Sequence, residues 1–113
     1  MGDENLIADA TARVGGGPAF VAYIAKAFTD VATKAGFTDD QALTFTCQVL
    51  RGTADLLTTT RQDPEHVYCR VTTGGTIEQG ILTLQNHHVH DTLLDVFDNA
   101  ACRARQLGFA ERG

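Results

Sequence analysis

The sequence lacks the features that mark membrane-spanning and nucleic-acid-binding proteins. It contains no apolar run of 18 residues, which is about the length a helix needs to cross a bilayer. It is also short of basic residues. The chain has nine Lys and Arg residues and 14 Asp and Glu residues, so its net charge is −5. Binding a phosphate backbone needs a basic surface. We therefore expect neither a membrane nor a nucleic acid as a partner.

Cysteine is scarce, and its spacing is uninformative for metal or disulfide chemistry. The three cysteines are odd in number, far apart and form no CxxC pair (Cys47, Cys69 and Cys102). This usage is typical of reduced thiols in a cytoplasmic protein. The first ten residues, "MGDENLIADA", lack the charged and apolar regions of a secretory signal, so we expect no such leader there.

Proline is limited to Pro18 and Pro64, and strand-like alternation is absent. Apolar residues instead recur at helical spacing between the glycine and proline positions. The chain has 113 residues, of which 43% are hydrophobic. This length and composition suit one globular domain over residues 1–113 with a modest core. We predict an all-α fold of about six helices joined by short connections.

Local signals predict where these helices begin and end. Pro18 and Pro64 suit the first position of a helix, where no N–H is needed. Thr38–Gln41 and Thr76–Gln79 both read as capping boxes, and Gly36 reads as a helix stop. The predicted helices cover about Glu4–Arg13, Pro18–Ala35, Asp39–Thr60, Pro64–Val71, a segment after Thr76 carrying Ile77, Ile81 and Leu84, and Val89–Leu107.

The third predicted helix is apolar around most of its circumference. Its polar residues form only a narrow stripe (Gln41, Thr44, Gln48, Arg51, Asp55 and Thr58). A helix with so wide an apolar surface is buried on more than one side. In so short a chain, a second copy is one source of that burial. We therefore expect a tightly packed, intertwined homodimer.

The stretch "VTTGGTIEQG" is the candidate binding segment. The first N–H groups of a helix lack intrahelical partners, and the helix dipole favours a negative charge there. Glycine lets a ligand approach the backbone, and threonine hydroxyls add donors. The candidate residues are Thr72, Thr73, Gly74, Gly75 and Thr76. From these residues alone, an ordinary connecting loop and a carboxylate or phosphate site both remain open.

Two other clusters carry weaker signals. The "GGG" before Pro18 is not preceded by a strand, as a dinucleotide-binding turn requires, and no P-loop lysine follows it. His87, His88 and His90 do not have the spacing of a helical zinc pair. We expect His87 and His88 in a turn, and we expect no metal site.

Several segments together resemble one known family. "LIADATARVGGGPAFVAYIAKAF" resembles the start of the C-terminal domain of pyrroline-5-carboxylate reductase, which has a "GSGPAY"-like turn before a long alanine-rich helix. "RQDPEHVYCRVTTGGTIEQGILTLQ" resembles its following helices and its "VTSPGGTTIAGLxxLE" loop, and "RARQLG" resembles its C-terminal end. The resemblance covers about Glu4–Gly108.

The resemblance implies an NAD(P)H-dependent oxidoreductase of proline biosynthesis. In that family, an N-terminal Rossmann domain binds NADPH or NADH, and the helical domain forms an interlocked dimer and sometimes rings of dimers. The loop matching Thr72 to Thr76 binds the substrate carboxylate, and a threonine hydroxyl there contacts the imine nitrogen. By this resemblance Thr76 is the candidate catalytic residue, and the partner molecule is a small cyclic imino acid.

Three departures from the family pattern matter. The 113 residues contain no Rossmann half, so we expect no cofactor site within them and no reductase activity from them alone. Gly16 stands where the family has serine. A residue, usually proline, is missing after Thr73. An alignment without a gap therefore puts Ile77 at the second threonine of the family motif, whereas a local shift puts Thr76 there.

Two functional hypotheses follow. The first is the dimerisation and substrate-binding domain of a pyrroline-5-carboxylate reductase-like enzyme. The alternative is a non-catalytic helical interaction module that reuses this fold.

Overall fold

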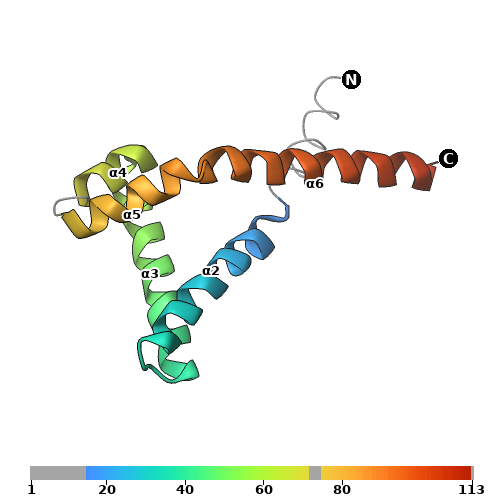
Figure 1. Ribbon diagram of the computed structural model, residues 1–113. Helices are drawn as coiled ribbons and strands as arrows, with labels where there is room; N and C mark the ends of the chain where they lie inside the picture. The colour runs from blue at the N-terminus through green and yellow to red at the C-terminus, as the bar shows by residue number, and fades with distance from the viewer. Residues whose placement is uncertain (1–14, 72–74, 113) are drawn as a thin grey trace. The chain divides into compact units, whose positions relative to one another are not determined.

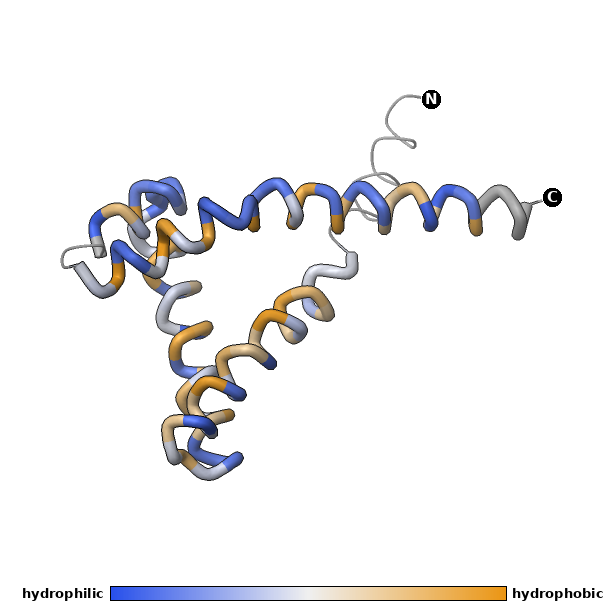
Figure 2. The backbone as a smooth tube through the Cα atoms, viewed as in Figure 1, coloured by the Kyte–Doolittle hydropathy of each residue, from blue (hydrophilic) through white to orange (hydrophobic). Residues whose placement is uncertain are grey.

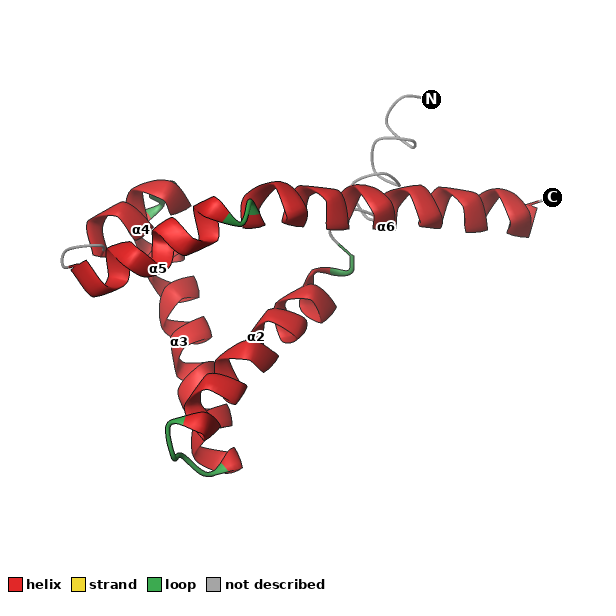
Figure 3. Cartoon of the chain, viewed as in Figure 1, coloured by secondary structure: helices red, strands yellow, loops and turns green. Residues whose placement is uncertain are grey.

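The described part of the chain is built entirely from helices and connecting turns. The structure is a computed structural model that describes residues 15–71 and 75–112. Within these ranges it contains five helices and no strand (Figure 3), so the predicted all-α class is confirmed. The predicted helix at about Glu4–Arg13 lies outside the described residues. The helices are α2 (Gly17–Lys34), α3 (Asp39–Thr60), α4 (Pro64–Val71), α5 (Gly75–Asn86) and α6 (Val89–Arg112) (Figure 1).

Helix α2 starts and stops close to the predicted residues. It begins at Gly17, one residue before Pro18, which therefore takes the second helical position rather than the first. Its end is closed by Gly36, which has a φ of 111°. The Gly36 N–H donates to the Thr33 carbonyl at 3.0 Å, and the Phe37 N–H donates to the Ala32 carbonyl at 3.2 Å. This is the hydrogen-bond pattern of a Schellman motif, which needs a left-handed residue.

Helix α3 is held at both ends by local contacts. The Gln41 N–H donates to the Thr38 hydroxyl at 3.2 Å, and the Thr38 N–H donates to the Gln41 side-chain oxygen at 3.0 Å. The predicted capping box at Thr38 is therefore confirmed. Arg61 closes the other end with a φ of 55°, and its N–H donates to the Leu57 carbonyl at 3.0 Å.

Helices α4 and α5 begin in different ways. The Asp63 carboxylate accepts the Glu65 N–H at 2.8 Å, which caps α4 and leaves Pro64 in the first helical position, as predicted. The capping box predicted at Thr76 is wrong, because α5 already begins at Gly75. Thr76 and Gln79 keep a spacing of three residues, but Thr76 lies inside the first turn and is not the residue before it.

Helix α6 starts at Val89, as predicted, and runs to Arg112. The prediction ended it at about Leu107. The helix instead continues through Gly108, since an interior glycine costs only about 1 kcal/mol relative to alanine. His87 and His88 form the turn before α6, as predicted, and His88 has a φ of 54°.

The described residues form two compact units with small buried cores. Of the described residues, one unit holds those within Ala22–Leu82, and the other joins residues 15–21 to residues 83–112. In the first unit the buried side chains are Ala32, Ala42, Thr46 and Val67. In the second, Ala101 is buried, and the Phe20 and Phe97 rings meet edge to face with their centroids 5.1 Å apart. The buried side chains of both units are therefore mostly small.

Many large apolar side chains stay outside these cores. Apolar segments recur along both α2 and α3 (Figure 2), yet several of their side chains are exposed in the single chain. On α3 these are Leu43, Phe45 and Leu56. The small cores and the exposed apolar residues are consistent with the predicted second copy, which remains a prediction.

Candidate functional site

The candidate carboxylate-binding segment lies at the start of α5. Gly75 and Thr76 occupy its first two helical positions, and both are exposed. Thr72, Thr73 and Gly74 lie outside the described residues. The N–H groups of a helix's first turn have no intrahelical acceptors, and the dipole places partial positive charge beside them. The described half of the predicted segment therefore has the geometry of an anion-binding helix start.

The backbone at Gly75 is open to approach. Apart from its chain neighbours and the backbone of its own helix, a β-carbon built on Gly75 meets no atom of the described residues within 4 Å. The Thr76 hydroxyl, one residue further on, is the nearest described side-chain donor along the chain.

Two charged residues flank this helix start in the sequence. Arg70 lies in the last turn of α4 and supplies a positive charge two residues before Thr72. Glu78 lies in the first turn of α5, where its negative charge competes with a bound anion. The sequence analysis missed Arg70. Its charge, next to an otherwise uncharged loop, was the available signal.

Tyr68, on α4, is the one described residue with a perturbed acidity. Partial desolvation raises the pKa of its phenol above the ordinary value, and the negative charges of Glu65, Cys69 and Asp63 raise it further. A phenol with a raised pKa stays protonated, so Tyr68 is a neutral hydrogen-bond donor. The sequence analysis did not select it, because its environment depends on the fold of α4.

The other glycine cluster has a packing role. A β-carbon at Gly16 would lie 2.8 Å from the tip of the Phe20 ring. The glycine therefore makes room for that ring. The Phe20 N–H also donates to the Gly16 carbonyl at 3.0 Å.

The histidine cluster is spread over a turn and a helix start. His87 and His88 precede α6, and His90 lies in its first turn, with Nδ1 3.7 Å from an Asp91 carboxylate oxygen. Within residues 15–71 and 75–112, no three His, Cys, Asp or Glu side chains are grouped to hold a metal ion. None of the helices in those ranges is long and apolar enough to span a bilayer.

These features describe an all-α helical domain with an open helix start suited to a carboxylate. The sequence pattern of the pyrroline-5-carboxylate reductase dimerisation family matches residues 4–107. The match covers nearly the whole chain, so the chain belongs to the pyrroline-5-carboxylate reductase dimerisation family.

Curated relatives agree with this assignment. The chain is 31% identical to pyrroline-5-carboxylate reductase of Synechocystis sp. over 106 residues, which is 93% of this chain and 40% of the relative. It is 32% identical to the Glycine max enzyme, again over 93% of this chain and 39% of the relative. It is 34% identical to pyrroline-5-carboxylate reductase 3 of Bos taurus, over 86% of this chain and 32% of the relative.

A solved structure shows the same fold. Pyrroline carboxylate reductase of Plasmodium falciparum, crystallised with NADP bound, superposes with a TM-score of 0.82 at 19% identity, over 90% of this chain and 39% of the other. The chain thus spans about two fifths of the relatives it matches. These findings support the hypothesis of a reductase-like domain and not the alternative of a non-catalytic helical interaction module that reuses the fold.

Proposed function

We propose that this chain is the dimerisation and substrate-binding domain of a pyrroline-5-carboxylate reductase-like, NAD(P)H-dependent oxidoreductase. The observation that carries the proposal is the family match over residues 4–107. The whole 113-residue chain acts as one such domain and pairs with a second copy. The nicotinamide cofactor supplies hydride when it is bound, and its site belongs to a Rossmann domain outside these 113 residues. The chain alone is therefore inactive as a reductase.

The start of α5 holds the substrate carboxylate. The backbone N–H groups of Gly74 and Gly75 donate to the carboxylate, and Thr72 and Thr73 line the same loop. Arg70 adds attraction for the anion because its charge lies at the end of α4. Thr76 places its hydroxyl at the imine nitrogen and is the proposed catalytic residue. Ile77 lies in the same first turn of α5, but its side chain is apolar, so the hydroxyl of Thr76 supports this assignment.

An NMR titration with L-proline tests the site directly. We expect saturable shifts of the backbone amides of Gly74, Gly75 and Thr76, because a carboxylate there accepts their N–H groups. Pyrrolidine, which keeps the ring but lacks the carboxylate, is the matched ligand control and should leave those amides unmoved. Equal shifts with both ligands, or none with proline, would contradict a carboxylate site at this helix start.

A further inference from the structure

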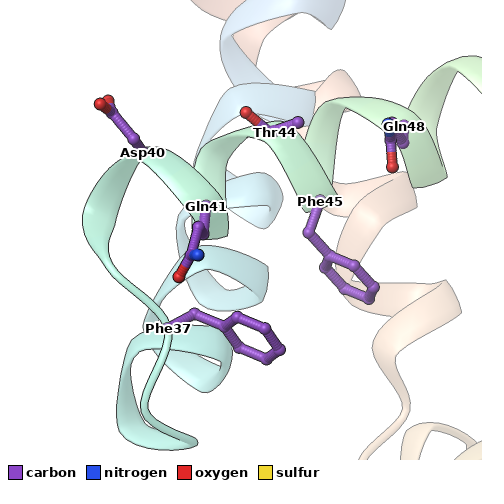
Figure 4. A pocket seen from close by; sticks show the side chains of 6 residues that line it. All are labelled: Phe37, Asp40, Gln41, Thr44, Phe45 and Gln48. Atoms are coloured by element: carbon purple, nitrogen blue, oxygen red, sulfur yellow. The ribbon is translucent and has the colours of Figure 1, made fainter.

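We draw no further inference here: the strongest candidate, the shallow groove at the start of α3 that Phe37 and Phe45 line (Figure 4), belongs to the exposed apolar face of that helix, and nothing in the structure shows what covers it beyond the second copy already expected.

Discussion

Thr46 shows how a single buried group costs stability. Thr46 is 1% exposed, and its buried hydroxyl has no hydrogen-bond partner within the described residues. Other threonines on α3 donate to the carbonyl four residues earlier, as Thr53 does to Val49 at 2.8 Å. A buried polar group without a partner loses its water hydrogen bonds and gains nothing in exchange.

We therefore expect Thr46→Val to raise the free energy of unfolding by about 1 kcal/mol, because valine keeps the shape and removes the unpaired hydroxyl. The matched control is Thr53→Val, on the same helix but exposed, which should change stability by no more than about 0.5 kcal/mol. Urea denaturation followed by circular dichroism measures both. A loss of stability in Thr46→Val would show that the hydroxyl has a partner.

At the scale of the element, α3 depends on the contacts at its first turn. The reciprocal Thr38–Gln41 capping box satisfies N–H groups that the helix itself leaves without acceptors. Thr38→Ala should lower the free energy of unfolding by about 1 kcal/mol. Thr58→Ala, on the exposed side of the same helix, should leave it unchanged or slightly higher, since alanine is the better helix former. Urea titrations that show equal losses for the two would rule out a capping role for Thr38.

The helices were largely predictable because their ends are set by neighbouring residues. The caps at Thr38 and Asp63 and the stop at Gly36 act over two to five residues, so the sequence displays them directly. The two errors have local causes as well. Gly75 enters α5 ahead of Thr76, and Gly108 is carried within α6 as an interior glycine.

Burial and the site environment were less predictable. The exposure of Phe45 and Leu56 depends on which helices approach α3, and the sequence spacing does not specify that. The place of Gly75 and Thr76 at a helix start was predictable, and the anion site there stays a proposal. The charge of Arg70 was readable in the sequence and was missed, whereas the raised pKa of Tyr68 depends on the surroundings that the fold gives to its phenol.

At the scale of the whole molecule, folding and pairing should be coupled. A chain whose buried side chains are few and mostly small gains little from its own core. Association then supplies part of the stability, and the stability depends on chain concentration. For unfolding coupled to dissociation, each tenfold dilution lowers the apparent free energy of unfolding by about 1.4 kcal/mol.

Thermal unfolding at several chain concentrations measures this coupling. We expect Tm to fall with dilution, while light scattering gives the mass of two chains at the higher concentrations. A Tm that is constant over a hundredfold dilution, together with the mass of one chain, would show that the chain folds unaided.

The contact between Gly16 and Phe20 also bears on how this sequence can change. Because the Phe20 ring lies over the space a β-carbon at position 16 would occupy, restoring serine there would push the ring tip aside. That ring also meets Phe97 edge to face. The effect of a mutation at position 16 therefore depends on the residues at positions 20 and 97. In evolutionary terms these three sites are linked, since serine at position 16 would be accompanied by a shift of the Phe20 ring that also meets Phe97.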